Sequence, residues 1–409
     1  MIYNKGVKVM GKKIMIVGAN FDDKGSQAKL YVVIDELRKR YSDCEVYYAH
    51  NDEQLDGSLY RFGKIALTKK AQSQVLRANP LTSITKIFKK KDDSSPGDKD
   101  ISDIVSQMDL IVDVSEQTLS DKKTLAEIEY YINNIKIAKK YKIPMVIMPQ
   151  SFGPFNFDVD SMYIMGDIKD ILFYPKVIFC RDQFGYDEMM GYFGLDNLRR
   201  ANDMLLIDDN FELPNVCSRF YKPDIPEVSD GENVAIIPNV ECFNKKYNDR
   251  SLEMYKRIFE SLKAARKEVY IVCQASSDME ICKELANAFR HFENIHLVEK
   301  ELDCVEFGMF IKKFEFVISS HYTNCVQAYR NYIPVLLLGS GAKFTELAEL
   351  LGQEKFCFDV LTEEFNSYDV VDALNDYIKD PDVAKTRIQT RMINLQEKSC
   401  FEIFDELKW

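Results

Sequence analysis

The chain contains 409 residues, of which 46% are hydrophobic and 29% are charged, as in an ordinary globular protein. This length predicts two or three domains, because single domains usually span about 100–200 residues. The 54 lysine and arginine residues against 65 aspartate and glutamate residues give a formal net charge of -11, which argues against nucleic acid as the principal partner.

The first elements alternate between strand and helix. Residues 13–17 are predicted as a strand, residues 26–40 as an amphipathic helix and residues 45–49 as a second strand. The turn after the first strand contains Asn20 together with Gly18 and Gly25. Because such turns lie at the ligand-binding edge of an α/β sheet, Asn20 is a candidate for substrate binding; the alternative is that the glycines merely shape a tight turn.

Residues 51–100 interrupt this pattern and are predicted as a basic insertion. Within them, residues 61–91 carry nine lysine or arginine residues and no acidic residue. One interpretation is an amphipathic helix around Ile84, Ile87 and Phe88 that contacts an anionic membrane surface; another is a segment that lines an acceptor groove. The plainer alternative is a mobile, solvated insertion, which is what most charge runs are.

Polar side chains then follow two further predicted strands. Strands are expected at residues 108–114, 145–148 and 177–180, with a helix at residues 125–141. Gln150 and Ser151 leave the second of these strands in a Gly-Pro turn, and Arg181 leaves the third. A guanidinium at a strand end can hold phosphate or carboxylate through two hydrogen bonds, while an internal contact with Asp182 is the alternative.

After a linker with several prolines at residues 211–231, the second half repeats the alternation. Strands are predicted at residues 234–237, 269–273, 295–298, 316–318 and 335–338, and Asn239 follows the first of them. The turn after the fourth strand contains Ser320, His321, Thr323 and Asn324, with Thr323 or Asn324 expected to cap the next helix. Uncapped helix N–H groups favour an anion, and the loop ending in Lys343 is placed to close over it.

Together these elements predict an α/β protein with two Rossmann-like domains facing a cleft, the arrangement called GT-B. The N-terminal domain is expected at residues 1–212, the C-terminal domain at residues 228–385, and a terminal helix at residues 386–409 is expected to cross the junction.

Several of these segments resemble the polysaccharide pyruvyl transferase family. Residues 149–155, Pro-Gln-Ser-Phe-Gly-Pro-Phe, are similar to the family's Pro-Gln-x-Phe-Gly-Pro-Phe, and Arg181-Asp182 is similar to its Arg-Asp/Glu segment. Lys343 agrees with the family's loop lysine. The family's Arg-x-His pair falls on His321 and Thr323, so neither member of the pair is kept.

The resemblance implies transfer of a pyruvyl group, as a ketal, from phosphoenolpyruvate to a cell-surface glycan such as an exopolysaccharide or capsule, or to its lipid-linked precursor. No cofactor is implied, and no metal cluster is visible in the pattern of histidines and cysteines. His321 is the candidate acid, or a cation in place of the family's arginine, and Asp22 or Asp23 is the candidate base. The expected substrate-binding residues are Asn20, Gln150, Ser151, Arg181, Asn239, Ser320, Thr323, Asn324 and Lys343.

Two alternatives stay open: a GT-B glycosyltransferase that uses a nucleotide sugar, and a family member that binds glycan or anion without turnover. Ten scattered cysteines without a Cys-x-x-Cys pair favour a reducing compartment. The expectation is a cytoplasmic protein without a signal peptide or membrane span, at the inner face of the membrane if residues 61–91 contact lipid.

Overall fold

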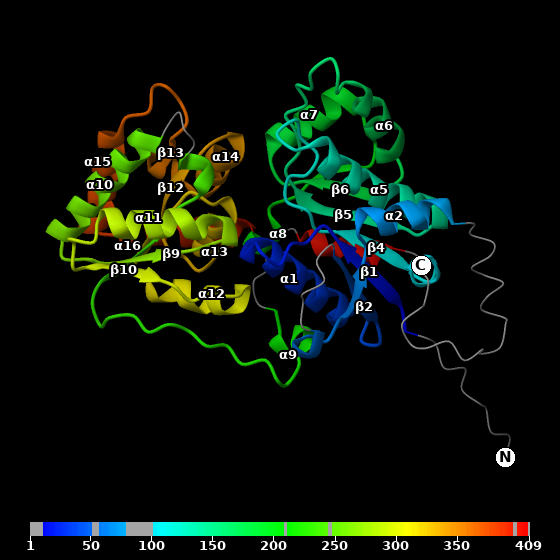
Figure 1. Cartoon of the computed structure of the whole chain (residues 1–409), viewed down its shortest axis with the longest axis horizontal. Coiled ribbons are helices and arrows are strands. Elements are labelled where there is room, and N and C mark those ends of the chain that lie inside the picture. The colour runs from blue at the N-terminus through cyan, green and yellow to red at the C-terminus, as the bar shows by residue number, and fades with distance from the viewer. Residues whose placement is uncertain are drawn as a thin grey trace.

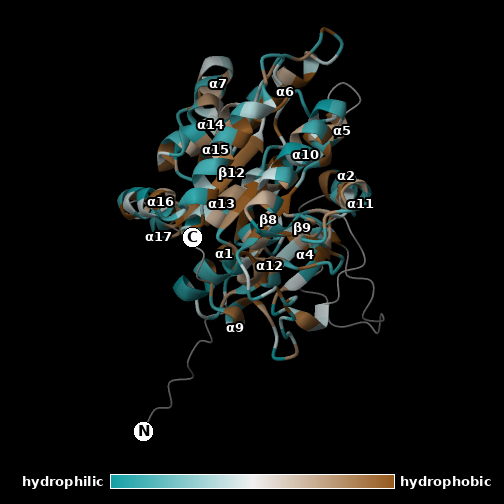
Figure 2. Cartoon of the chain, turned by 90° about the vertical axis from the view of Figure 1, so that its left-hand side faces the viewer, coloured by the Kyte–Doolittle hydropathy of each residue, from teal (hydrophilic) through white to brown (hydrophobic). Residues whose placement is uncertain are grey.

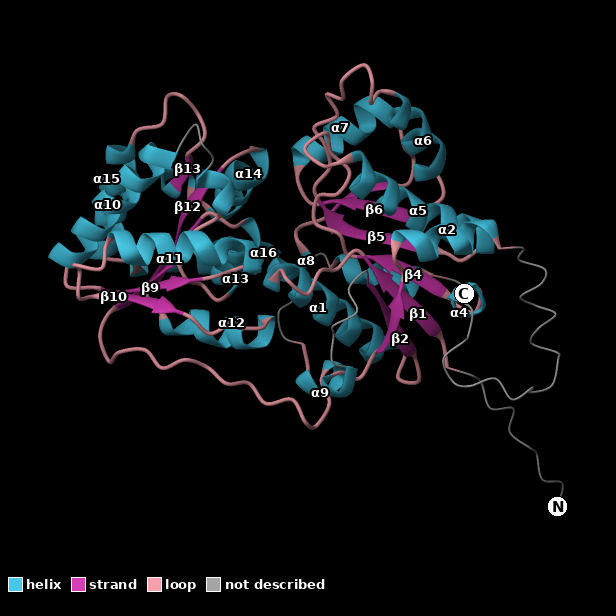
Figure 3. Ribbon diagram, viewed as in Figure 1, coloured by secondary structure: helices cyan, strands magenta, loops and turns pink. Residues whose placement is uncertain are grey.

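The computed structural model describes residues 11–50, 57–78, 101–207, 211–243, 248–395 and 399–407, and these residues form two lobes (Figure 1). Each lobe is built on one sheet of parallel strands with helices packed against it (Figure 3). The prediction of two Rossmann-like units is therefore confirmed.

The sheet of the N-terminal lobe has the strand order β3-β2-β1-β4-β5-β6-β7. Its strands are β1 (Lys13–Val17), β2 (Glu45–His50), β3 (Gly63–Ala66), β4 (Leu110–Asp113), β5 (Met145–Gln150), β6 (Val177–Cys180) and β7 (Leu198–Arg200). Its helices are α1 (Lys24–Arg40), α2 (Lys69–Arg77), α4 (Ile101–Val105), α5 (Leu125–Tyr141), α6 (Tyr163–Leu172), α7 (Gln183–Phe193), α8 (Met204–Ile207) and α9 (Leu213–Val216).

The sheet of the C-terminal lobe has the order β10-β9-β8-β11-β12-β13. Its strands are β8 (Asn233–Ile237), β9 (Glu268–Val272), β10 (Ile295–Val298), β11 (Phe316–Ser319), β12 (Val335–Gly339) and β13 (Cys357–Asp359). Its helices are α10 (Asn248–Ala264), α11 (Met279–Ala288), α12 (Cys304–Phe310), α13 (Tyr322–Arg330), α14 (Ala342–Leu351) and α15 (Ser367–Lys379).

The central strands are apolar on both faces, as parallel strands covered by helices must be. Every residue of β4, β5, β8 and β12 is buried, and Figure 2 shows the hydrophobic strands β8 and β12 between more polar helices. One continuous apolar cluster reaches from Ile16 in β1 through Tyr31 in α1 to Val317 in β11. The two lobes therefore pack against each other through a shared hydrophobic cluster.

The expected basic insertion is partly folded into the N-terminal lobe. Residues 57–78 form a short 3-10 turn, β3 and α2, and β3 pairs with β2 at the sheet edge. Ala71 and Val75 of α2 are buried, while Lys69 and Lys70 face solvent. The basic part of the described segment forms an ordinary amphipathic helix, so the interpretation of this part as a mobile insertion was wrong. Residues 79–100, with the expected helix around Ile84, lie outside the described residues.

The expected single helix at residues 386–409 is instead two helices. The first, α16 (Asp382–Leu395), packs against α14, and the second, α17 (Ile403–Glu406), packs against α1 of the other lobe. The hydroxyl of Tyr41 donates to the carbonyl of Phe404, and Arg40 pairs with Asp405 at 3.2 Å. The C-terminal segment therefore does cross the junction between the lobes, as the sequence predicted.

The connection from the N-terminal to the C-terminal lobe runs through α9 and an irregular segment, residues 218–232, along one side of the molecule (Figure 1). This segment begins within the linker expected at residues 211–231 and extends one residue beyond it. Across the described ranges, none of the helices has both the length and the apolar character needed to cross a membrane.

Candidate active site

Turns from the carboxyl ends of the two sheets are in direct contact. Asp23, in the turn after β1, forms an antiparallel backbone bridge with Ala275, which follows β9. The next residue, Lys24, donates from Nζ to the carbonyl oxygen of Gln274 at 2.5 Å. The start of α1 therefore packs against a loop of the C-terminal lobe, at the sheet edge where α/β proteins bind ligands.

Arg181, at the end of β6, is held by acidic side chains of its own lobe. Its Nη1 lies 2.7 Å from Oε2 of Glu116 and 3.0 Å from Oδ2 of Asp203. Its Nε donates to Oγ of Ser151 at 2.8 Å, and the side chain is 1% exposed. The predicted strand-end arginine is in place, but its charge is already balanced by two carboxylates.

Lys29 of α1 joins the same ionic cluster. Its Nζ lies 2.6 Å from Oε1 of Glu116 and 3.5 Å from Oδ2 of Asp203. Burial alone would raise the pKa of Glu116, but attraction to Lys29 and Arg181 outweighs burial and lowers this pKa to about 2. Lys29, Arg181 and Asp203 are buried, and with the partly exposed Glu116 they form an ionic network of two cations and two carboxylates.

Tyr322 links this network to the C-terminal lobe. Its ring lies beneath the guanidinium of Arg181 at 4.2 Å, and Nζ of Lys343 lies 5.8 Å from the same ring. Lys343 also donates to Oε1 of Gln117 in the N-terminal lobe at 3.1 Å. Burial, followed by repulsion from Arg181, lowers the pKa of Lys343 to about 8. Arg181 and Lys343, predicted to share a site, therefore do converge, on Tyr322.

His321 immediately precedes Tyr322 and is paired with a buried acid. Its Nε2 lies 2.8 Å from Oδ2 of Asp278, which is 1% exposed, and 3.2 Å from the carbonyl oxygen of Pro238. The charge of His321 also lowers the pKa of Asp23, although burial and the charge of Glu116 raise that pKa overall. Asp23 and His321 are therefore near one another, across the boundary between the lobes.

The start of α13 differs from the prediction. His321 is the N-cap residue and makes no side-chain cap, whereas Thr323 and Asn324 lie inside the first turn. They cannot cap from there, because a cap precedes the first helical residue. Asn324 is fully buried, and neither its Nδ2 nor its Oδ1 has a hydrogen-bond partner. Ser320 is also buried, with Oγ 3.5 Å from the hydroxyl of Tyr255.

Other predicted side chains are used within their own turns. Asn20 accepts from the backbone N–H of Asp22 at 3.0 Å, and Asn239 accepts from that of Glu241 at 2.9 Å. Asp22 is exposed, while Asp23 caps α1 by accepting from Ser26 N at 2.7 Å. Gln150 is fully buried and donates to Oδ1 of Asp113 at 3.1 Å.

Sequence reasoning missed four members of the site: Lys29, Glu116, Asp203 and Asp278. The sequence gives no indication that Lys29 belongs to the site, because Lys29 lies inside a predicted helix and not at a strand end. Glu116 and Asp278 each follow a predicted strand within six residues, so their position at the ligand-binding edge was the available signal. Asp203 lies three residues after the end of β7, at the same edge of the sheet.

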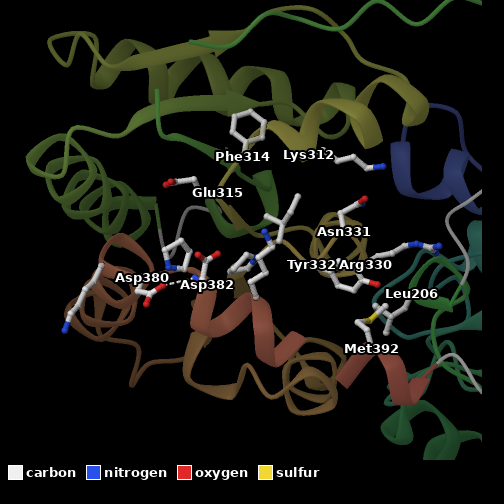
Figure 4. Close-up of a pocket in the computed structure, with 15 residues that line it drawn as sticks. Leu206, Lys312, Phe314, Glu315, Arg330, Asn331, Tyr332, Asp380, Asp382 and Met392 are labelled. Carbon is white, nitrogen blue, oxygen red and sulfur yellow. Dashed lines mark hydrogen bonds between the residues drawn. The ribbon is translucent and has the colours of Figure 1, made fainter. Parts of the chain in front are cut away.

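A separate hollow of about 770 Å³ lies at the opposite edge of the C-terminal sheet (Figure 4). Its wall includes Phe314 and Glu315, which precede β11, and Pro334, which precedes β12. It contains none of the predicted site residues. Among the residues that the structure describes, no group of three or more His, Cys, Asp or Glu side chains is arranged to hold a metal ion.

The fold and its meeting strand ends define a two-lobed protein of GT-B type. Solved structures agree over nearly the whole chain at low identity. A Listeria monocytogenes protein assigned as a UDP-N-acetylglucosamine 2-epimerase is 12% identical with a TM-score of 0.57, covering 97% of this chain and 98% of that one. The Neisseria meningitidis UDP-GlcNAc 2-epimerase is 13% identical, with a TM-score of 0.52 and coverage of 96% and 98%. A glycotransferase of kitacinnamycin is 11% identical, with a TM-score of 0.50 and coverage of 97% and 98%.

The family is settled by sequence. The model of the polysaccharide pyruvyl transferase family matches residues 23–340, and the chain belongs to that family. This confirms the resemblance that the strand-end motifs indicated. A comparison with curated proteins gave no match.

Proposed function

We propose that this protein transfers a pyruvyl group from phosphoenolpyruvate to two hydroxyls of a glycan, forming a ketal. Membership of the polysaccharide pyruvyl transferase family carries this proposal. The position of Lys343 beside Tyr322 at the start of α13 supports it, because the donor carries both a phosphate and a carboxylate. The acceptor we propose is a cell-surface glycan or its lipid-linked precursor.

The reaction balances without a cofactor. Two acceptor oxygens bond to C2 of phosphoenolpyruvate, and the C2–O bond to phosphate breaks with its electron pair leaving on phosphate. One hydroxyl proton goes to the methylene carbon, which becomes a methyl group, and the other leaves with phosphate. The protein must therefore hold two anionic groups and move a proton, and it needs a base and an acid near the same ligand.

Lys343 and the first turn of α13 are the anion-binding groups in this proposal. Lys343 approaches the site from the C-terminal lobe, and the only side-chain hydrogen bond it makes among the described residues is to the neutral Gln117. The amide of Asn324 has buried, unpartnered donor and acceptor atoms, which a bound ligand would satisfy. Arg181, with its charge balanced by Glu116 and Asp203, positions Tyr322 instead.

The test is release of phosphate from phosphoenolpyruvate in the presence of candidate acceptor glycans. Lys343→Ala is expected to raise the KM for phosphoenolpyruvate by at least about tenfold, which corresponds to about 1.4 kcal/mol of lost anion binding. Lys283→Ala is the matched control, because Lys283 is an exposed lysine on α11. No release with any acceptor, together with no binding of phosphoenolpyruvate, would contradict the proposal.

A nucleotide-sugar transferase is the second candidate, favoured by the replaced Arg-x-His pair. Thr323, which stands at the place of the family's histidine, packs directly against Gly25 of the other lobe and is buried. In this case a uridine or guanosine sugar nucleotide should raise the melting temperature while phosphoenolpyruvate does not. Binding of either ligand without product would indicate the third alternative, a family member without turnover.

We also propose that the protein works in the cytoplasm, with peripheral membrane contact through residues 61–91. In the described part of this segment the apolar face of α2 is buried, so contact would depend on cations such as Lys69 and Lys70. Sedimentation with phosphatidylserine vesicles tests this, and Lys69→Glu/Lys70→Glu should weaken it. Equal sedimentation of the wild type and this variant would contradict the assignment.

A further inference from the structure

Within the described ranges, the imidazole of His321 makes its hydrogen bonds through one nitrogen, Nε2. Both neighbours of Nε2, the carboxylate of Asp278 at 2.8 Å and the carbonyl of Pro238 at 3.2 Å, are hydrogen-bond acceptors. Nε2 must therefore carry the hydrogen. Among the hydrogen bonds of the described residues none involves Nδ1, and the side chain of His321 is 13% exposed.

Asp278 is itself fixed by the loops around it. Its Oδ1 accepts from Val240 N at 3.0 Å and its Oδ2 accepts from Ala275 N at 3.2 Å. Burial would raise the pKa of Asp278, but the hydrogen bond and charge of His321, together with these backbone donors, lower it. Asp278 is therefore an ionised carboxylate whose position is set by the turns after β8 and β9.

On the basis of the proposed function, we propose that Asp278 is a positioning residue: it fixes His321 with hydrogen on Nε2 and so leaves the Nδ1 lone pair to accept a proton from the acceptor hydroxyl. His321 stands where the family pattern has an arginine, so the pair gives this chain a proton acceptor in place of a permanent cation. When Nδ1 takes the proton, the ring becomes an imidazolium, and the Asp278 carboxylate balances its charge. Nδ1 then gives the proton to the methylene carbon, which returns the ring to its neutral state.

The arrangement also sets where the acceptor must lie. Asp23 approaches the same ring from the N-terminal lobe: burial and Glu116 raise its pKa overall, and the charge of His321 partly opposes this rise. Ala275, whose backbone N–H binds Asp278, is bridged to Asp23. The imidazole and the groups that orient it belong to the C-terminal lobe, and the bridge from Ala275 to Asp23 places the proton acceptor at the boundary between the lobes.

Nitrogen NMR of the imidazole tests the assignment without any assay of turnover. Protein labelled with ¹⁵N-histidine contains four imidazoles, and His321→Gln identifies the signal of interest. At a pH where the ring is neutral, His321 is expected to carry its hydrogen on Nε2. A wild-type ring with its hydrogen on Nδ1 would overturn the proposal, whether or not any variant folds.

Asp278→Asn adds a kinetic readout. Its carboxamide can donate to Nε2, so the hydrogen of His321 is expected to move to Nδ1. With phosphoenolpyruvate and an accepted glycan, kcat should fall at least roughly 100-fold, as for loss of general base catalysis, while KM for phosphoenolpyruvate changes less than about threefold. A raised KM with unchanged kcat would overturn the proposal.

Glu268→Gln is the matched control. Glu268 pairs with His296 at 2.6 Å at the opposite end of β9, so only the His296 signal should change, and kcat should be unaffected. The two proposals fail separately. Hydrogen on Nε2 in the wild type and on Nδ1 in Asp278→Asn, without phosphate release, would contradict the proposed function and support the role of Asp278 in orienting His321. Phosphate release with hydrogen on Nδ1 would overturn that role alone.

Discussion

Gly25→Ala is expected to push the two lobes apart. A Cβ atom on residue 25 would lie 2.3 Å from Cβ, 2.5 Å from Oγ1 and 2.6 Å from Cγ2 of Thr323 in the other lobe. Carbon atoms in contact are normally about 3.5–4.0 Å apart, so α1 and α13 must separate by about 1 Å or more. Overpacking of this kind typically costs about 1–3 kcal/mol.

This cost exceeds the benefit of alanine to the helix. Gly25 is the second residue of α1, where alanine gains at most about 1 kcal/mol over glycine. Even with the full gain from alanine, the net loss reaches about 2 kcal/mol, which shifts the population toward separated lobes by up to roughly 30-fold. Small-angle X-ray scattering should show a larger radius of gyration, and the KM for phosphoenolpyruvate should rise.

The control is Gly191→Ala on α7, because a Cβ at residue 191 meets no atom within 4 Å. Adding Thr323→Gly to Gly25→Ala removes all three clashing atoms and should restore the radius of gyration of the wild type. If Gly25→Ala scatters like Gly191→Ala, the close approach of α1 to α13 does not hold in solution, and the site built on it is refuted.

Three further predictions concern individual charged groups. Glu346 of α14 accepts from the backbone N–H groups of residues 183 and 184 at the start of α7, at 2.5 and 2.9 Å. Glu346→Gln should weaken the association of the two lobes by about 1–3 kcal/mol, which would appear as a larger radius of gyration. Glu349 is exposed, and Glu349→Gln should leave the radius of gyration unchanged. Asp113 is fully buried, and burial raises its pKa to about 6, so the wild type should lose stability as pH rises from 4 to above 6. Asp113→Asn should remove this loss. At pH 8 its free energy of unfolding in urea should exceed that of the wild type by on the order of 1–3 kcal/mol. The KM for phosphoenolpyruvate should rise as pH increases through about 8, where Lys343 loses its charge, and Lys343→Arg should flatten that rise.

Local pattern was enough to predict most of the strands, though not β3, β7 or β13, and to place polar turns at the strand ends, but it did not predict the charge balance around those turns. The strand Val177–Cys180 and the placement of Arg181 at its end follow from an apolar run before a polar turn. The partners of Arg181 do not, because Glu116 and Asp203 are 65 and 22 residues away in sequence. The spacing of residues within one element says nothing about which loops of other strands will meet it. For the same reason, the sequence did not predict that Asp278 pairs with His321.

The two cations of the site consequently differ in what they can offer a ligand. The charge of Arg181 is balanced within the N-terminal lobe by Glu116 and Asp203, whereas Lys343 belongs to the C-terminal lobe and reaches Gln117 across the boundary. Burial between the lobes is the main reason for its lowered pKa of about 8, so Lys343 is poised to lose its proton near that pH.

An anion bound beside Lys343 restores the charged form. At pH 8.5, binding of phosphoenolpyruvate should therefore take up on the order of half a proton or more. Calorimetry in buffers of different ionisation enthalpy measures this uptake, and Lys343→Arg, which stays charged, should abolish it. Binding at pH 8.5 with no proton uptake by the wild type would mean that the ligand is held elsewhere than at the boundary between the lobes.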